Sequence, residues 1–229
     1  MSNVRAITWS KKTEQANWIV RNLHDDYTVA MLLPPSFDAY ARLLHPIAAD
    51  TVTGRLFIRW REVATVVGGT IHPRVQFDTL APGQKDDYVP AQGSLPIEDA
   101  RVLVDTLAPF TPQTEPCWFT VWFGYADMMT VTQRPVPPPS VHGVLDREYI
   151  LYSGTIDSAF TLIECGWNQT PNLWWPSNHS WCVASEIDLD STYIGGSKAL
   201  IRALLANPNL EAVPVKLDDP ITANSDDIN

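Results

Sequence analysis

Three acidic residues at alternate positions, Glu186, Asp188 and Asp190, form the pattern with the clearest chemical meaning in this sequence. Alternate residues of an extended strand project from one face, so we expect the three carboxylates to converge. Mg²⁺ and Mn²⁺ prefer oxygen ligands, and the pair Asp188 and Asp190 has the DxD form with which glycosyltransferases and nucleotidyltransferases hold a metal–nucleotide. In the structural alternative, Glu186 and Asp188 lie on a solvated sheet face and Asp190 accepts turn amides.

A second candidate site is a turn formed by Gly195, Gly196 and Ser197, which we predict immediately before a helix. Free amides and the dipole at a helix N-terminus hold anions such as phosphate. The spacing is neither that of a P-loop nor that of a GxGxxG fingerprint. In nucleotidyltransferases of the polymerase-beta type the Gly-Ser helix precedes the paired aspartates, whereas here it follows them. An ordinary tight turn is the alternative.

Nine tryptophans are present, and Trp174 and Trp175 fall in the aromatic stretch TPNLWWPSNHS. Exposed indole faces would offer a platform for a sugar ring, a base or a cation. The alternative is that these side chains fill the core beneath a long loop. The sequence therefore gives Trp174 and Trp175 as candidate ligand-binding residues.

Other catalytic patterns are absent from the sequence. The five histidines form no HxH or HExxH pair, and no GxSxG elbow supports a serine hydrolase. Cys117, Cys165 and Cys182 have no CxxC spacing and are odd in number, which favours reduced thiols. We therefore expect no cofactor, with Mg²⁺ or Mn²⁺ required only if the acidic row is catalytic.

The charge of the chain limits the classes of partner that we expect it to bind. The formal net charge is −10 for 229 residues, and after residue 62 the chain has 8 Lys/Arg against 20 Asp/Glu. An acidic surface repels phosphate backbones and anionic lipids, so we expect neither a nucleic-acid nor a membrane partner, and a basic protein partner would fit better. The first residues lack the apolar run of a secretion signal, and no stretch approaches the roughly 20 apolar residues of a membrane span, so we expect a cytoplasmic protein.

Two stretches predict the architecture. Residues 117–125 are apolar on both faces, which is typical of a buried central strand. Residues 181–189 alternate like a half-covered strand, and a turn over 190–196, an amphipathic helix ending at Asn207 and an edge strand over 211–215 complete a β-α-β unit.

Helical spacing also predicts helices over 60–67 and 96–107, and another that begins at Ser36. We therefore predict an α+β or α/β fold with a mixed central sheet. Residues 1–215 form a single globular domain in this interpretation. Residues 216–229 form an acidic tail that is loosely held unless it docks through Ile221 or Ile228.

The run from NLWWPSNHSWCVASEIDLDSTYIGG onwards, together with LPPSFDAYARLLHP and CWFTVWFGY, resembles a bacterial protein family that is frequent in actinomycetes. Its members have a similar Trp-Trp-Pro loop, a WCVATEIDLDSTYVGG-like motif and a chain end like SDDIN. The resemblance implies no activity and assigns no catalytic residue.

We therefore carry two hypotheses for the function. The leading one is a cytoplasmic binding or interaction protein, an accessory or immunity-like factor whose acidic surface engages a protein partner. The alternative is a metal-dependent enzyme acting on a nucleotide or sugar, with Glu186, Asp188 and Asp190 as its metal ligands.

Overall fold

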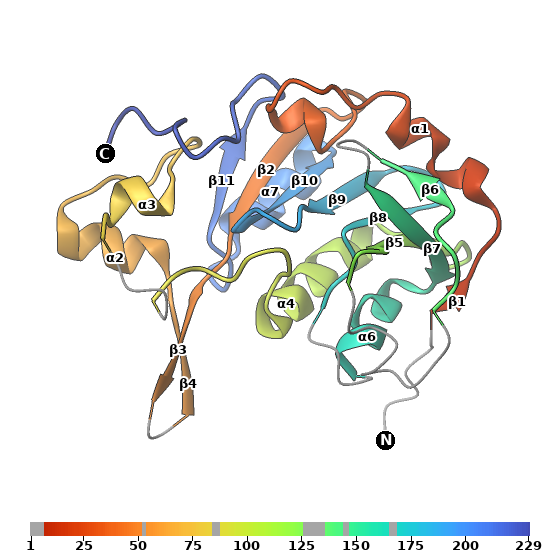
Figure 1. The fold of residues 1–229 in the computed structure, drawn as a ribbon, viewed down its shortest axis with the longest axis horizontal. Helices are drawn as coiled ribbons and strands as arrows, with labels where there is room; N and C mark the ends of the chain where they lie inside the picture. The colour runs from red at the N-terminus through yellow and green to blue at the C-terminus, as the bar shows by residue number, and fades with distance from the viewer. Residues whose placement is uncertain (1–6, 52–53, 84–87, 126–135, 144–146, 165–168) are drawn as a thin grey trace.

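A nine-stranded sheet forms the centre of the computed structural model (Figure 1), which describes residues 7–51, 54–83, 88–125, 136–143, 147–164 and 169–229. The described strands of this sheet pair antiparallel with their neighbours, and helices pack against its faces, so the predicted α+β class is confirmed. In order across the sheet the strands are β1 (Thr8–Trp9), β7 (Glu148–Gly154), β5 (Cys117–Trp122), β8 (Leu173–Pro176), β9 (Trp181–Ser185), β10 (Ser191–Gly196), β2 (Ala39–Leu44) and β11 (Ala212–Val215), and β6 (Val141–His142) also pairs with β7.

Helices and short 3-10 turns cover the sheet and connect its strands. Among the described residues, no helix combines the length and the apolar character that a membrane span requires. In chain order these elements are η1 (Thr13–Ala16), α1 (Asn17–Val20), η2 (Val29–Met31), α2 (Trp60–Val67), α3 (Phe77–Leu80), α4 (Ile97–Leu107), η3 (Ala108–Phe110), η5 (Ile156–Phe160), α6 (Thr161–Glu164) and α7 (Lys198–Ala206).

Strand β5 lies inside the sheet between β7 and β8, as its two apolar faces predict. Phe119 packs into the core beneath α4 and α7, while Trp118 packs into the core on the opposite face. The strand ends at Trp122, three residues before the predicted end at 125, and Phe123 beyond it is 41% exposed. The central, buried position of this strand is confirmed.

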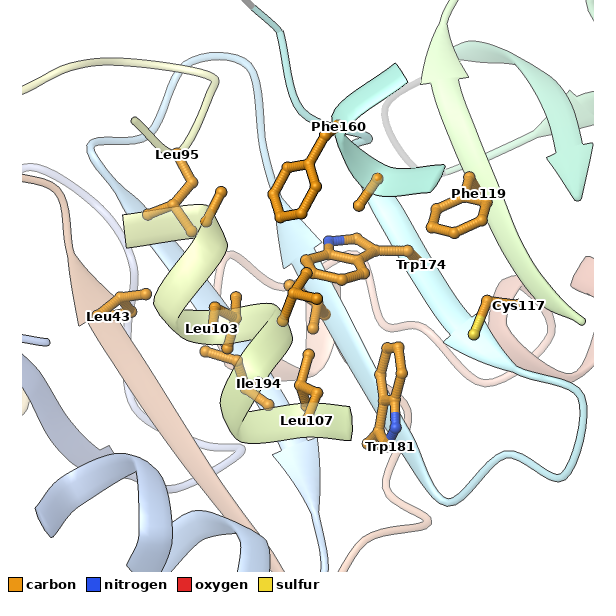
Figure 2. Close-up of a cluster of buried hydrophobic side chains, with 14 of the residues drawn as sticks. Leu43, Leu95, Leu103, Leu107, Cys117, Phe119, Phe160, Trp174, Trp181 and Ile194 are labelled. Carbon is orange, nitrogen blue, oxygen red and sulfur yellow. The ribbon is translucent and has the colours of Figure 1, made fainter. Parts of the chain in front are cut away.

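Figure 2 shows the first core, in which α4 lies across the sheet with Leu103 and Leu107 facing Ile194 and Trp181. The indoles of Trp174 and Trp181 meet edge to face with ring centroids 5.6 Å apart. Full burial of each such side chain contributes on the order of 2 kcal/mol. This layer of helices therefore fixes the strands from one side.

The second core is covered by the N-terminal segment and by the end of the chain. Ile19 and Leu33 pack there against Trp175, and Ile221 closes the cluster from the C-terminal side. Because both faces of the sheet are covered, strands inside it such as β9 and β10 have no solvent-exposed face.

This double coverage explains one wrong prediction, the helix expected from Ser36. The segment is strand β2, whose Ala41 faces the first core and whose Tyr40 faces the second. Tyr40 and Leu44 are four residues apart and both are buried, which imitates the spacing of a helical stripe.

The C-terminal β-α-β unit is present but begins one strand later than predicted. Strand β9 ends at Ser185, and the expected turn over 190–196 is instead strand β10. Strands β10 and β11 both pair antiparallel with β2, which lies between them, so they run parallel and α7 makes the crossover. All five residues of β9 are buried, so this strand is not half-covered as expected.

Pro214 marks β11 as the edge of the sheet, as predicted. The amide of Leu44 donates to the carbonyl of Glu211 at 2.8 Å, and the same register pairs Pro214 with Ala41 at a position without ladder hydrogen bonds. The nitrogen of Pro214 therefore points away from β2, and its missing hydrogen costs the ladder nothing.

A smaller unit packs beside the sheet around the buried indole of Trp60. It consists of α2, α3 and the hairpin of β3 (Ile47–Thr51) and β4 (Gly54–Ile58), which projects from the body (Figure 1). Helix α2 ends at Gly68, whose φ of +76° gives the left-handed cap expected of glycine. Its first amides, those of Trp60 and Arg61, donate to the carboxylate of Glu211 at 2.7 and 2.8 Å.

The C-terminal segment 216–229 is docked, which corrects the prediction of a loosely held tail. Ile221 is buried as the alternative required, whereas Ile228 is 56% exposed. The carboxylate of Asp226 accepts the amide of Gln76 at 3.1 Å and lies 3.0 Å from Nε2 of His72. The sequence of residues 216–229 did not predict these polar contacts, because its low apolar content indicated a segment without a docking surface.

Candidate functional site

A cavity of about 790 Å³ opens between the end of β9, the C-terminal segment and the start of α3. All three residues of the predicted acidic row line it, together with a fourth carboxylate, Asp78. The remaining lining residues are Tyr27, Met31, Gln76, Phe77, Val89, Pro90, Gln92, Leu189, Ile221, Thr222 and Ala223.

The acidic row is a turn and not a strand face, which corrects the predicted geometry. Glu186, Asp188 and Asp190 connect β9 to β10, and the amide of Asp188 donates to Oε2 of Glu186 at 2.7 Å. The amide of Leu189 donates to the backbone carbonyl of Glu186 at 3.1 Å. The carboxylates are therefore brought to one cavity by a turn held by its own backbone amides.

Two arginines contact the three carboxylates. Arg147 lies 2.9 Å from Glu186 through Nε and 2.7 Å from Asp188 through Nη2. Arg42 lies 3.3 Å from Asp190 through Nη2. Among the described residues, no group of three or more His, Cys, Asp or Glu side chains is arranged to hold a metal ion. Metal binding by the row remains a prediction, and its carboxylates already have guanidinium partners.

Arg42 is a buried charge that fixes the wall of the cavity. Its side chain is 3% exposed and its Nε donates to Oγ of Ser191 at 2.8 Å. Its Nη1 donates to the carbonyl of Val75 at 2.6 Å, just before the cavity-lining Gln76. Because a buried guanidinium must be paired, Arg42 joins Asp190 to the segment that leads into α3.

His45 supports the same wall from behind. Its Nδ1 lies 2.7 Å from the carbonyl of Ala91 and its Nε2 lies 2.8 Å from Oγ1 of Thr192, which is 2.6 Å from Oγ of Ser185. Since a carbonyl only accepts, Nδ1 carries the hydrogen and Nε2 accepts from Thr192. Burial lowers the pKa of His45, although Ala91 and Asp190 act in the opposite direction. A neutral ring therefore holds the segment around Ala91 against the sheet.

Tyr27 stands at the cavity in an unusual backbone conformation. Its φ is +55°, a value rare for a residue with a side chain, and the residue is 55% exposed. Its carbonyl accepts the amide of Ile221 at 3.0 Å, which ties this conformation to the docked tail. Strained residues of this kind gather at functional sites.

The predicted aromatic platform does not form. Trp174 is 1% exposed and lies in the first core (Figure 2), while Trp175 is fully buried in the second. Neighbouring residues of a strand point to opposite faces, so β8 places one indole in each core. Their role in the structure is packing.

The predicted glycine turn is part of strand β10. A side chain at Gly195 would collide with the ring of Phe37, and one at Gly196 would meet the side chain of Leu200 at 2.6 Å. Close packing therefore explains both glycines. Ser197 does cap α7 as predicted, because its Oγ accepts the amide of Leu200 at 3.2 Å. None of Gly195, Gly196 and Ser197 lines the acidic cavity.

Sequence reasoning placed the three acidic residues together but missed the rest of the cavity. Tyr27 lies far in sequence from Gln76 and Asp78 at the start of α3, and no motif links these two segments to the acidic row. Long-range contacts bring them together: the tail pairs with residues 27–30, Asp226 accepts the amide of Gln76, and Arg42 links Val75 to Asp190. Comparison of the chain with protein-family models, curated proteins and solved structures found no match.

Proposed function

We propose that this chain is a binding protein, an accessory or immunity-like factor, whose acidic cavity accepts a basic segment of a partner protein. The observation that carries the proposal is the composition of the lining: among the described residues it has four carboxylates and no Lys, Arg or His. Arg42 and Arg147 contact three of these carboxylates, which leaves a formal charge of −2 at the cavity.

The carboxylates have oxygen atoms to offer an incoming cation. Asp78 makes no hydrogen bond or ion pair with any other described residue, and Asp188 is 74% exposed. Among the described residues, Oδ1 of Asp188 and Oδ2 of Asp190 have no hydrogen-bonding partner. Charge-assisted hydrogen bonds from an ammonium or guanidinium group would use these positions.

The apolar part of the lining suits the stem of a long basic side chain. Lys and Arg bury their methylene groups against apolar surface while the charged head stays polar. Val89, which is 38% exposed, and the partly buried Leu189 supply such surface, and the ring of Tyr27 adds a face that attracts cations. The net charge of −10 would speed the approach of a basic partner.

Binding of a labelled peptide of alternating lysine and leucine tests this proposal. We expect fluorescence anisotropy to report binding at low salt that weakens as salt rises, because exposed charges are screened. The double variant Asp78→Asn/Asp188→Asn should bind about fivefold more weakly, since each exposed pair contributes roughly 0.5 kcal/mol. A matched control, Glu14→Gln/Asp105→Asn, removes the same charge from exposed positions outside the cavity and should bind like the parent chain.

The enzyme hypothesis keeps one observation in its favour, namely that Glu186, Asp188 and Asp190 border a cavity. A calorimetric titration with Mn²⁺ and a nucleotide, repeated on Asp188→Ala, separates the two functions. Heat that is lost in the variant, with no binding of the lysine-leucine peptide, would replace the binding proposal by a metal-dependent activity. We also propose a cytoplasmic location, which the free thiols of Cys117 and Cys182 support.

A further inference from the structure

A second hollow of about 500 Å³ lies on the surface between α7 and the end of edge strand β11. It shares no lining residue with the acidic cavity. We refer to it as the α7 groove. Its lining residues are Asp38, Ala39, Tyr40, Lys198, Ile201, Arg202, Leu205, Pro214, Val215, Lys216 and Leu217.

Basic side chains dominate the charge of the α7 groove. Lys198 and Arg202 are four residues apart on α7 and so share one face of the helix, and Lys216 follows β11. All three are exposed, and none forms an ion pair with another described residue. Asp38 is the single acidic residue among the described residues of the lining. The groove is therefore cationic on a chain whose net charge is −10.

Apolar side chains lie beside these cations. Leu205 is 36% exposed, and Pro214 and the partly buried Leu217 extend the apolar surface toward the edge of the sheet. An added strand is disfavoured at this edge, because Pro214 has no amide hydrogen to offer outward. An occupant would therefore be held by its side chains, apolar ones against Leu205 and acidic ones against the three cations.

From this charge complementarity we propose that the α7 groove docks an acidic, leucine-bearing segment of a partner protein. The opposite sign of the groove and the acidic cavity means that one chain recognises two segments of different chemistry. The inference does not depend on the function proposed for the cavity.

A labelled peptide of alternating glutamate and leucine is the probe, measured by fluorescence anisotropy on the whole chain. We expect it to bind at low salt and to bind about fivefold more weakly to Lys198→Gln/Arg202→Gln. The matched control Lys12→Gln/Arg21→Gln removes the same charge at exposed positions outside the groove and should leave binding unchanged. Unchanged thermal unfolding of both variants excludes a folding defect, because all four side chains are exposed.

Measuring each double variant with the peptide meant for the other site distinguishes binding at the groove from binding at the cavity. Lys198→Gln/Arg202→Gln should leave binding of the lysine-leucine peptide unchanged, and Asp78→Asn/Asp188→Asn should leave binding of the glutamate-leucine peptide unchanged. Failure of the lysine-leucine peptide alone would remove the cavity proposal and leave this one standing.

Several results would overturn the proposal. Absence of glutamate-leucine binding, or equal binding to the groove variant, would do so directly. Displacement of the peptide by inorganic phosphate at equal concentration would reveal a simple anion site. Sedimentation of the chain as an oligomer that dissociates in Lys198→Gln/Arg202→Gln would show that a second copy occupies the groove.

Discussion

Two acidic clusters of this molecule differ in what surrounds their oxygen atoms. Glu211 at the start of α2 is 3% exposed and accepts the amides of Trp60 and Arg61, while Asp99 pairs through both oxygens with Arg59. In the cavity, carboxylates such as Asp78 keep oxygen atoms without a described partner. The first cluster therefore holds elements together, and the second keeps acceptor positions open.

The contrast shows why acidic residues at a suggestive spacing are weak evidence for a site. Glu211 belongs to no acidic motif in the sequence, yet its carboxylate accepts the first amides of α2 and its carbonyl accepts the amide of Leu44 in β2. Asp188 and Asp190 have a recognised motif, and their arginine partners leave part of each carboxylate open. Whether an acid is structural or functional depends on how many of its acceptor positions the fold fills.

The largest effect is expected from Glu211→Ala. The change leaves two helix amides of α2 without an acceptor and removes the carboxylate partner of Arg61, whose side chain keeps only its hydrogen bond to the carbonyl of Leu210 among the described residues. Breaking a buried, hydrogen-bonded charge of this kind costs about 4 kcal/mol. Urea unfolding of the variant measures the loss in the free energy of unfolding. A loss below about 1 kcal/mol would mean that Glu211 is as dispensable for stability as the open carboxylates of the cavity.

A smaller effect is expected from pH, through the buried ring behind the cavity wall. Because burial lowers the pKa of His45 in the folded chain, the unfolded chain binds the proton first as pH falls below about 6.5. Stability should therefore be full at higher pH and decline below that point, by at most about 1.4 kcal/mol per pH unit. Asp190 and Asp99 reduce the effect and Arg42 increases it.

Unfolding of the parent chain and of His45→Gln between pH 7 and pH 5 checks this expectation. The variant lacks the titrating ring, so its stability should change less over this interval. An equal slope in both chains would assign the pH dependence to other groups.

The smallest effect on stability is expected from Asp78→Asn, the counterpart of the Glu211 variant. Asp78 is exposed and has no described partner, so the change should alter the free energy of unfolding by no more than about 0.5 kcal/mol. Urea unfolding run beside Glu211→Ala provides the measurement. A loss comparable with that of Glu211→Ala would mean that the two acidic clusters do not differ as we describe.

Elements with one polar face were predictable from the sequence. Helices α2, α4 and α7 each show apolar residues at helical spacing, and Gly68 and Pro208 mark two of their ends. Strand β5 was recognisable because its short run of residues is apolar on both faces, whereas a fully buried helix would need a longer apolar run. In these segments the order of apolar and polar residues predicts which side chains are buried.

Elements between the two cores were harder to predict. In β2 both faces are buried, so Tyr40 and Leu44 resembled a helical stripe. In the turn after β9, Ile187 and Leu189 continue the alternation of the strand, which hid the change of direction before β10. Gly195 and Gly196 resembled a turn because the sequence does not reveal Phe37 and Leu200 packed against them.

The candidate site was predictable only where its residues are close in sequence. The three carboxylates of the turn were placed together correctly, although on the wrong kind of element. Asp78 and Tyr27 reach the cavity through the docking of the tail, and Asp226 gives no local signal of that contact. Polar contacts between single residues that are distant in the chain produce no repeating pattern in the sequence, so they could not be predicted from it.

The walls of the acidic cavity come from segments that span nearly the whole chain, from Tyr27 to Ala223. Closing loops of that length is entropically costly, and contacts between distant residues form late in folding. A chain that has formed only its helices and local hairpins would have no cavity to offer. Recognition of a basic segment would thus be restricted to finished molecules, and an occupant would favour the completed fold by mass action.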